Sequence, residues 1–493
     1  MKQTLALLLS VCLLTGFAPS LAALEEPTKI TMIVYLPDEY QKDNPIVPEI
    51  NRLANVELEL IIPPFTGYVE SRNRMLAAND LPDVVMFETI DDKQYRNAVE
   101  DGMLIDLRAY LENAPNIQKY TDEMAFLYVT NDDGSITAIP RGSLNRGDGF
   151  MIRQDWLDAL GIAEVPRDVE GFVDMLYRFA KEDPDGNGLD DTYAWTDNEN
   201  SYGIVSYFAR AYGADFGWQV DQSGDIYHSR YRGDGFKKGL EIARTLMADG
   251  VIDPEMLVNR TAREKFLNGQ IAIRGEYVGW LPRNRDALMA NVPEARLGYA
   301  YPPANVETGA TEVLNSTVMG VWWIYGITAA CEDPQKVVGF FDWCLSDEGW
   351  PLLVNGIEGI HYTVDANGNH RFTEAFKQYN DWRNYIAFLR RPDIDFYISK
   401  ALAPEDTLLV SETLAYVTRV NVMQKHLGHR VPYQDELAKD DWGSREIKTI
   451  MDILYGELPV DSWDDFVAEY RAGGFDTVEQ QMNEWYHTFM GKR

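Results

Sequence analysis

The chain has 493 residues, which is enough for two or three domains, and 45% of them are hydrophobic. Its 12 Trp, 27 Tyr and 20 Phe residues allow large cores and argue against global disorder. The formal net charge of −33 makes nucleic acid and anionic membrane surfaces poor partners, so we expect no nucleic-acid binding.

The N-terminus has the pattern of a secretory signal peptide. Lys2 supplies the positive end, Leu5–Phe17 is a short apolar core, and Ser20–Ala23 offers small residues for cleavage. We expect cleavage after Ala22 or one residue later, which gives a secreted protein that is periplasmic or associated with the cell surface. Cys12 lies inside the apolar core and follows a valine, which argues against a lipid anchor.

The two remaining cysteines are predicted to be free thiols. Asp333 and Pro334 suit the N-cap and first position of a helix that begins between Cys331 and Cys344. This helix would hold the two Cα atoms on the order of 15 Å apart. A disulfide needs roughly 4.4–6.8 Å, so we expect no bond between them.

Strand and helix patterns alternate over residues 29–141. Strands are predicted at Ile30–Leu36, Val56–Ile62 and Asp83–Phe87, with helices at Val47–Ala54 and Val69–Ala78. This alternation predicts an α/β fold with a mainly parallel sheet. Ligands bind at the carboxyl ends of such strands, where Tyr35 and Glu88 would lie, although capping of the core explains each of them equally well.

Two later stretches indicate a chain that leaves its first domain and returns. Arg141–Gly149 is a polar, glycine-rich run and the best linker candidate. Asp168 is placed to cap a helix that reaches about Lys181. The apolar run Val318–Ile327, followed by the helix after Asp333, predicts a strand and helix that rejoin the first sheet.

The stretch Asp183–Asp191 has the spacing of a calcium loop. Oxygen ligands would come from Asp183, Asp185, Asn187, the Leu189 carbonyl and Asp191. The loop departs from an EF-hand because position 12 is Ala194 instead of a bidentate Glu. The alternative is an acidic, solvated turn after the preceding helix; if calcium binds, its role is structural.

Catalytic motifs are weak, whereas aromatic residues after strands are prominent. His426 and His429 have helical metal spacing without a recognisable third ligand, and adjacent acidic pairs are expected by chance among 78 acidic residues. Aromatic side chains that follow strands suit sugar rings, although each alone is more often part of a core; they are Tyr277, Trp280, Trp322, Trp323 and Tyr362. Strand alternation would turn one of Trp322 and Trp323 inward and the other outward.

Several ordered motifs together resemble a known family. They are Leu81–Phe87, Ile152–Gly161, the Asp183–Asp191 loop, Gly326–Ala330 before Asp333-Pro334, Ser346–Gly349, Gly356–Val364 and Leu454–Val460. In this order the chain resembles extracellular solute-binding proteins of ABC importers, in the oligosaccharide-binding group related to maltose- and alginate-oligosaccharide-binding proteins. The resemblance covers nearly all of the mature chain.

The resemblance implies a type II periplasmic-binding-protein fold of two discontinuous α/β lobes joined by a multi-strand hinge. The expected parts are a signal peptide (1–22), lobe 1 (24–141 plus 318–357), lobe 2 (149–303 plus 362–493) and hinge crossings at 142–148, 304–317 and 358–361. Tyr277 stands where the maltose-binding relatives have a stacking Trp. The calcium loop matches the alginate-binding relatives, except that Thr192 replaces their last acidic ligand.

The implied function is to bind an oligosaccharide between the lobes and to deliver it to the transmembrane subunits of an ABC permease. We expect a monomer without enzymatic activity and with a structural Ca²⁺. The expected ligand-binding residues are Tyr35, Glu88, Arg141, Asn145, Arg153, Tyr277, Trp280, Trp322, Trp323, His361 and Tyr362. The alternatives are a secreted carbohydrate-active enzyme and a ligand-sensing receptor for a membrane histidine kinase.

Overall fold

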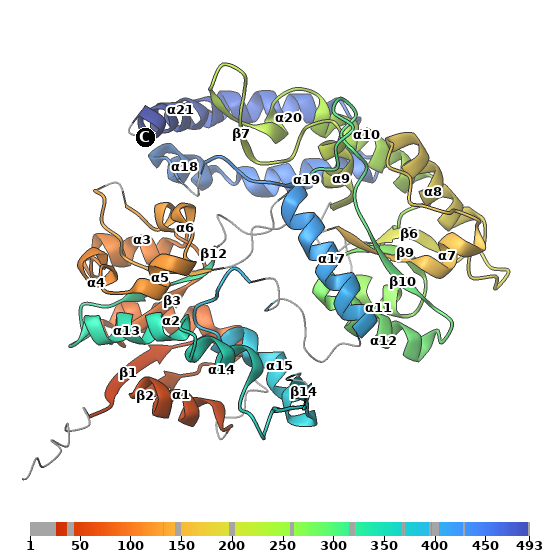
Figure 1. Ribbon diagram of the computed structural model, residues 1–493. Coiled ribbons are helices and arrows are strands. Elements are labelled where there is room, and N and C mark those ends of the chain that lie inside the picture. The colour runs from red at the N-terminus through yellow and green to blue at the C-terminus, as the bar shows by residue number, and fades with distance from the viewer. Residues whose placement is uncertain are drawn as a thin grey trace, which may run out of the picture.

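The strands of the protein form two main sheets, each with its own helices, in the computed structural model (Figure 1). The described residues are 26–36, 44–131, 133–142, 149–196, 203–256, 261–314, 321–366, 368, 370–393, 396, 404–426 and 429–491. The predicted signal peptide lies outside them. No helix within these ranges is long and apolar enough to cross a membrane.

The first sheet combines strands from the start of the chain with one from much later. Its order is β2 (Val56–Ile61), β1 (Thr28–Ile33), β3 (Val84–Phe87), β12 (Val321–Ile327) and β4 (Ile139–Gly142). β1 runs parallel to β2 and β3, whereas β12 is antiparallel to both β3 and β4. The predicted return of the chain into the first sheet is therefore confirmed.

Helices cover the first sheet and bury its apolar side chains in one core. They are α1 (Ile46–Ala54), α2 (Tyr68–Ala78), α3 (Lys93–Glu100), α4 (Arg108–Leu111), α5 (Pro115–Tyr120), α6 (Glu123–Tyr128), α13 (Pro334–Cys344), α14 (Gly349–Asn355) and α15 (Glu374–Ile386). The Asp333 side chain accepts from the Lys336 backbone N–H at 3.2 Å, which confirms the predicted N-cap of α13. Cys331 and Cys344 are both free, as predicted.

The second sheet is formed by residues between the two visits to the first. Its order is β10 (Leu297–Ala300), β5 (Phe150–Arg153), β9 (Ile271–Gly275) and β6 (Tyr193–Thr196). β5 is antiparallel to both of its neighbours, and β6 is parallel to β9. This sheet has a separate hydrophobic core, so the molecule has two lobes.

Most of the second lobe is helical. Its helices are α7 (Gln154–Ala159), α8 (Val169–Lys181), α9 (Gly203–Ala211), α10 (Gly235–Ala248), α11 (Ala262–Leu267), α12 (Leu281–Asn291), α17 (Pro404–Val420), α18 (Pro432–Leu437), α19 (Trp442–Leu454), α20 (Ser462–Tyr470) and α21 (Asp476–Gly491). Asp168 caps α8 by accepting from the Gly171 N–H at 2.7 Å, and the helix ends at Lys181, as predicted.

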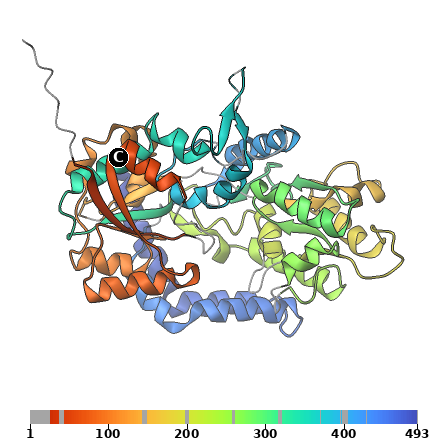
Figure 2. The same ribbon diagram turned by 90° about the horizontal axis from the view of Figure 1, so that it is seen from below.

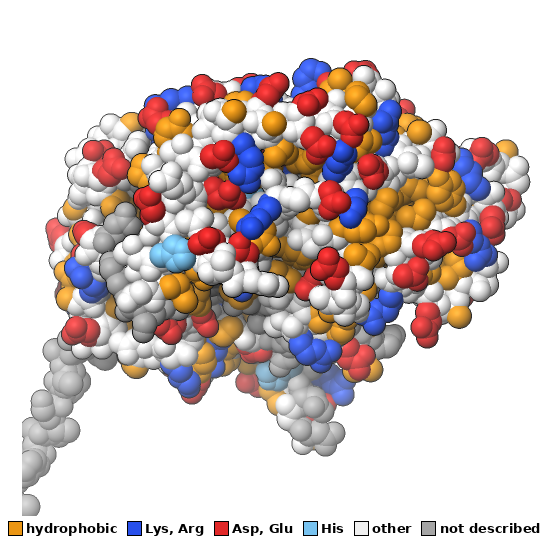
Figure 3. All heavy atoms as spheres, turned by 90° about the horizontal axis from the view of Figure 1, so that it is seen from above, with side chains coloured by type: hydrophobic (Ala, Val, Ile, Leu, Met, Phe, Trp, Pro, Cys, Tyr) orange, Lys and Arg blue, Asp and Glu red, His pale blue; other side chains and the backbone are white. Residues whose placement is uncertain are grey.

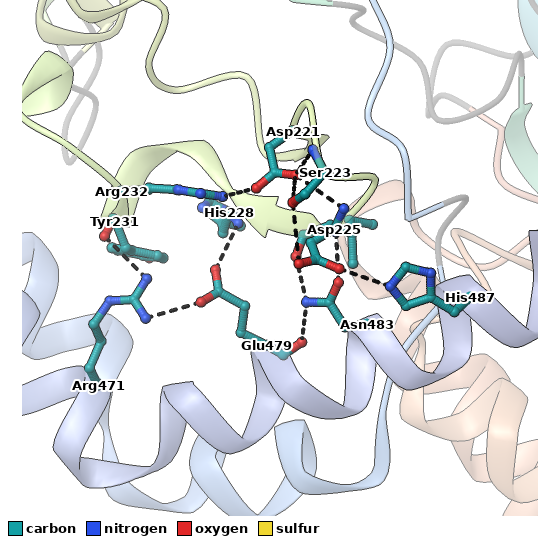
Figure 4. A network of polar contacts seen from close by, with 11 residues as sticks. Asp221, Ser223, Asp225, His228, Tyr231, Arg232, Arg471, Glu479, Asn483 and His487 are labelled. Atoms are coloured by element: carbon teal, nitrogen blue, oxygen red, sulfur yellow. Dashed lines mark hydrogen bonds and ion pairs between the residues drawn. The ribbon is translucent and has the colours of Figure 1, made fainter.

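The last helix is fastened to the second lobe through a small hairpin of β7 (Trp218–Val220) and β8 (Ile226–His228) (Figure 4). The Asn483 amide accepts from the Ile226 N–H and donates to its carbonyl, both at 2.8 Å. A side-chain amide that satisfies both backbone groups of one strand residue fixes the register between the hairpin and α21.

The cores indicate where the chain crosses between the lobes. Residues 376–396 contribute Phe376, Tyr379, Ile386, Phe388 and Phe396 to the first core, although we expected residues 362–493 in the second lobe. Val410 and Leu414 then pack on Val278 of the second lobe. This core membership corrects the expected third crossing at 358–361, and we place it between Phe396 and Val410.

The second crossing is stabilised by a pair of short strands. β11 (Val313–Leu314), which lies in the expected crossing 304–317, pairs in parallel with β15 (Asn421–Val422). Met423, directly after β15, packs against the first core. The Gln219 side chain of the second lobe donates to the Met423 carbonyl at 3.3 Å, so this residue contacts both lobes.

Candidate functional site

The edge of the first sheet where its parallel strands end carries a group of aromatic side chains. Tyr35 follows β1, and its ring stacks on Phe65 with centroids 4.2 Å apart. Its ring also contacts Trp323 edge-on at 5.3 Å and Tyr385 at 6.0 Å. These four residues, Tyr35, Phe65, Trp323 and Tyr385, are called the aromatic group below.

The Trp323 backbone has an unusual conformation that positions its ring in this group. The pairing between β12 and β4 is irregular between Val321 and Ile324, and Trp323 has a φ of +79°. A positive φ is costly for a residue with a large side chain and recurs where structure is under functional constraint. The bulge interrupts strand alternation, so the Trp323 ring packs on Tyr385 at 5.9 Å.

A buried arginine lies beneath the aromatic group. The Arg141 side chain is fully buried, and its guanidinium lies 4.6 Å from the centre of the Trp323 ring. Its Nε donates to the Ala387 carbonyl at 3.1 Å. Arg141 therefore supports the aromatic group from below, through a cation–π contact and a hydrogen bond.

Glu88 brings a carboxylate to the same edge. It follows β3 and is exposed. Burial of Tyr35 raises the pKa of its hydroxyl, and the neighbouring Tyr385 and Glu88 raise this pKa further. Tyr35 and Glu88 therefore lie within electrostatic reach of each other, as expected for residues that follow adjacent parallel strands.

One edge of the second sheet is rich in tyrosine. The register places Phe150, Gly275 and Ala300 at the same edge. Around it, the Tyr299 hydroxyl accepts from the Gly149 N–H at 2.8 Å and donates to the Glu276 carbonyl at 2.9 Å. The Tyr207 hydroxyl donates to the Gly149 carbonyl at 3.2 Å, Tyr277 is half-buried, and the Glu276 carboxylate pairs with Arg274 at 2.6 Å.

Trp280 presents the most exposed aromatic surface near this second edge. It lies five residues beyond β9, and 41% of its surface is accessible. The Arg283 guanidinium lies 5.5 Å from the centre of its ring. An exposed indole beside a guanidinium offers both a stacking face and hydrogen-bond donors.

The chain path brings the two edges together. β4 ends at Gly142 and β5 begins at Phe150, so these ends are at most about 28 Å apart even when the chain between them is fully extended. Burial lowers the pKa of Arg383, in α15 of the first lobe, to about 10, and Tyr277 of the second lobe opposes this shift. An electrostatic effect of this kind requires the two side chains to be near each other.

The structure places three predicted ligand residues away from these edges. Arg153 is at the opposite end of β5 from the edge; its side chain is buried, pairs with Asp155 at 2.6 Å and donates to the Gly269 carbonyl. His361 is buried, and its Nδ1 accepts from the Ile357 N–H at 2.9 Å. Tyr362 begins a hairpin that projects from the molecule (Figure 2).

In this structure these three residues lie apart from the aromatic group, and two further predicted residues lie outside the described part of the chain. Asn145 and the Trp322 side chain lie outside the described residues. Three further aromatic residues at these edges were not predicted from the sequence: Phe65, Tyr385 and Tyr207. Phe65 lies in a short turn after β2, so a search for aromatic residues that follow strands would have included it. Tyr385 and Tyr207 lie on helices, and their distance from the edges depends on how those helices pack.

The predicted calcium loop brings its side chains together around Asn187. The Asn187 amide nitrogen donates to Asp185 at 3.0 Å and to Asp191 at 3.1 Å. Asp183 accepts from the Asn187 and Gly188 N–H groups. Partial burial raises the pKa of Asp185, and the neighbouring carboxylates of Asp183 and Asp191 add to this effect. Asp183, Asp185 and Asp191 therefore converge.

The fit of this loop to a metal ion is incomplete. Among the residues that the structure describes, no group of three or more His, Cys, Asp or Glu side chains is arranged to hold a metal ion. Thr192, which replaces the last acidic ligand of the alginate-binding relatives, donates its hydroxyl to the Phe179 carbonyl at 3.0 Å and is buried. Rotation of the Asn187 amide would turn its oxygen toward the carboxylates in place of its nitrogen.

The comparisons with known proteins agree on one class of fold. The alginate-binding protein AlgQ2, solved without calcium ion, superposes with a TM-score of 0.71 at 20% identity, over 94% of this chain and 99% of that one. The S. pneumoniae substrate-binding protein FusA in complex with kestose gives 0.70 at 17% identity, over 94% and 100%. The fold is thus the two-lobed type II periplasmic-binding-protein fold, as predicted.

The sequence comparisons identify the family. The polygalacturonan/rhamnogalacturonan-binding protein YtcQ of Bacillus subtilis (strain 168) is 24% identical over 388 residues, which cover 73% of this chain and 72% of YtcQ. The family model described as bacterial extracellular solute-binding protein matches residues 35–349. The chain belongs to this family, which confirms the resemblance read from the sequence.

Proposed function

We propose that this protein is the extracellular binding component of an ABC importer and that it binds an oligosaccharide between the two sheet edges. Its similar proteins YtcQ, AlgQ2 and FusA are, respectively, a polygalacturonan/rhamnogalacturonan-binding protein, an alginate-binding protein and an ABC-transporter substrate-binding protein solved with kestose. The bound oligosaccharide would then be delivered to the transmembrane subunits of the permease.

The observation that carries this proposal is the aromatic group at the edge of the first sheet. Aromatic faces pack on the apolar faces of sugar rings, while the hydroxyls of Tyr35 and Tyr385 and the Glu88 carboxylate provide hydrogen-bonding groups at the margin. Trp323 is held by a bulge and by the buried Arg141, so its ring is ordered before ligand arrives. Pre-ordered groups lose less conformational entropy on binding.

We propose binding without catalysis. Hydrolysis of a glycan needs two carboxyl groups placed on either side of the scissile bond. Of the two carboxylates described at the edges, the one on the second lobe, Glu276, is engaged by Arg274 at 2.6 Å. The relatives named above are binding proteins.

The remaining expectations form part of the same proposal. We propose a secreted monomer with a signal peptide over residues 1–22 and a lobe arrangement of 24–142 with 321–396 and 149–301 with 404–491. We also propose a structural Ca²⁺ at the Asp183–Asp191 loop. The convergent carboxylates support this site, and a FusA EF-hand mutant occurs among the similar structures.

The test is a glycan-library screen by thermal shift, followed by calorimetry on each hit with three proteins. Trp323→Ala should weaken binding about tenfold, because it removes a stacking face worth about 1–2 kcal/mol. Tyr362→Ala, in the projecting hairpin, is the matched aromatic control and should bind as the wild type does. The proposal would be contradicted if the protein cleaved a glycan, or if Trp323→Ala and Tyr362→Ala lost the same amount of binding affinity.

A further inference from the structure

A groove on the helical side of the second lobe is separate from the sheet edges described above. It lies between α8 and α10, has a volume of about 460 Å³, and includes none of the proposed sugar-binding residues. Its lining residues are Val169, Glu170, Val173, Tyr177, Tyr212, Glu241, Ile242, Thr245 and Leu246. The spacing of Val169, Val173 and Tyr177 along α8 places their side chains on one face of that helix.

The floor of this groove is apolar and partly open to solvent. Val169, Val173 and Ile242 are half-exposed, whereas Leu246 is buried beneath them. In the space-filling view from above, a band of hydrophobic side chains runs over the region of α8 and α10 (Figure 3). Contiguous apolar surface with a polar border is typical of a site where another molecule packs.

The charged residues of the lining are acidic. Glu170 and Glu241 are both exposed, one on each helix. Lys238 lies nearby, over the Tyr212 ring at 5.1 Å, and forms an ion pair with Asp234 at 2.9 Å. Both red and blue side chains border the hydrophobic band in Figure 3. The groove lining therefore offers an apolar floor with one exposed carboxylate on each of its two helices, on a chain whose formal charge is −33.

We propose that the groove binds an amphipathic helix of a partner protein, with apolar side chains on one face and Lys or Arg residues beside them. A groove between two helices takes side chains from a third helix at three- and four-residue spacing. Lys or Arg beside those side chains would pair with Glu170 and Glu241. This site does not depend on the proposed sugar-binding function, because it uses other residues.

The experiment uses a labelled synthetic helix of Leu and Lys, about 18 residues long so that it forms a helix when bound, and the full mature protein. Fluorescence anisotropy in moderate salt should show saturable binding. The double variant Val173→Gln/Ile242→Gln keeps the net charge and should weaken binding about tenfold by removing the apolar floor. Glutamine is a good helix former, so both helices should persist.

A second pair of variants separates the groove from general attraction by a negative protein. Glu170→Gln/Glu241→Gln should weaken binding about tenfold, whereas Glu112→Gln/Glu332→Gln, exposed residues of the first lobe, remove the same charge and should have little effect. Equal effects of the two pairs would overturn the proposal. The proposal would also be overturned if either groove double variant bound the peptide as tightly as the wild type does. It would be overturned as well if the wild type self-associated in sedimentation and Val173→Gln/Ile242→Gln abolished that association, because a second copy of this chain would then be the occupant.

Discussion

Arg96 and Asp435 come from different lobes, and their side chains form an ion pair with Nη2 3.5 Å from Oδ1. Arg96 lies on α3, whose Tyr95 is part of the first core, and Asp435 lies on α18, whose Leu437 packs in a cluster with Phe475 of the second lobe. Arg430 also pairs with Asp435, at 2.9 Å. The observed lobe arrangement thus includes a small charged contact between α3 and α18.

We predict that Asp435→Asn loosens this contact between the lobes. Exposed ion pairs contribute about 0.2–1 kcal/mol and weaken in salt, so the change should be modest and largest at low ionic strength. Small-angle scattering should show a larger radius of gyration for the variant at low salt, and high salt should abolish the difference. Asp440→Asn, an exposed acid just after α18, is the control and should scatter like the wild type.

Much of the fold could be predicted from the sequence because its signals are local. The N-cap residues Asp168 and Asp333 and the apolar stripe of α13 mark their helices without knowledge of the rest of the chain. The third crossing could not be found in this way. The pattern from residue 370 onward predicts mostly helices, but which core α15 joins depends on long-range packing of Phe376 and Tyr379.

The candidate site shows the same limit. Tyr35 and Glu88 were found because they follow strands of a parallel sheet. Arg153 also adjoins a strand, but β5 is antiparallel to its neighbours, so its last residue lies at the opposite edge. The Trp323 orientation required knowledge of a bulge, because alternation along a regular strand assigns faces by residue number alone.

The Trp323 backbone leads to a prediction that reverses the usual order of two substitutions. Glycine is normally less favourable than alanine within a strand, but here φ is +79°, a value that glycine adopts without strain. Trp323→Gly and Trp323→Ala remove the same ring, so the two variants differ mainly in the backbone strain at this φ. We therefore expect the glycine variant to be more stable by about 1 kcal/mol. Urea unfolding measures this difference, and a more stable alanine variant would refute it.

We predict that Ca²⁺ raises the melting temperature of the mature protein and that a chelator reverses the effect. A ligand at 100 times its Kd stabilises the folded state by about 2.7 kcal/mol. Asp191→Asn should abolish most of the shift, because Asp191 accepts from Asn187 at the point where the carboxylates converge. Asp190→Asn, the exposed neighbour, should retain it. An unchanged melting temperature with Ca²⁺ would contradict the proposed metal loop.

His228, whose Nδ1 is enclosed by protein although the residue as a whole is only half-buried, predicts a loss of stability in mild acid. Desolvation, together with the nearby positive charge of Arg230, lowers the pKa of His228 to about 3, from an ordinary value of 6.5. Its ring packs against Tyr231 at 4.8 Å and Trp218 at 5.4 Å. Between these two pKa values the unfolded chain binds a proton that the folded protein does not, so stability is complete above about pH 6.5 and declines as the pH falls toward 3.

We therefore predict that His228→Phe reduces the acid sensitivity of the protein. At pH 5 the histidine should cost about 2 kcal/mol relative to pH 7, since each pKa unit corresponds to 1.36 kcal/mol. Phenylalanine keeps an aromatic ring against Tyr231 and Trp218 but has no proton to bind. The comparison is the change in unfolding free energy between pH 7 and pH 5 within each protein, which cancels differences in packing. His487→Gln, an exposed histidine on α21 shown in Figure 4, should leave this change close to that of the wild type. An equal acid loss in His228→Phe and the wild type would show that His228 does not bind the proton on unfolding.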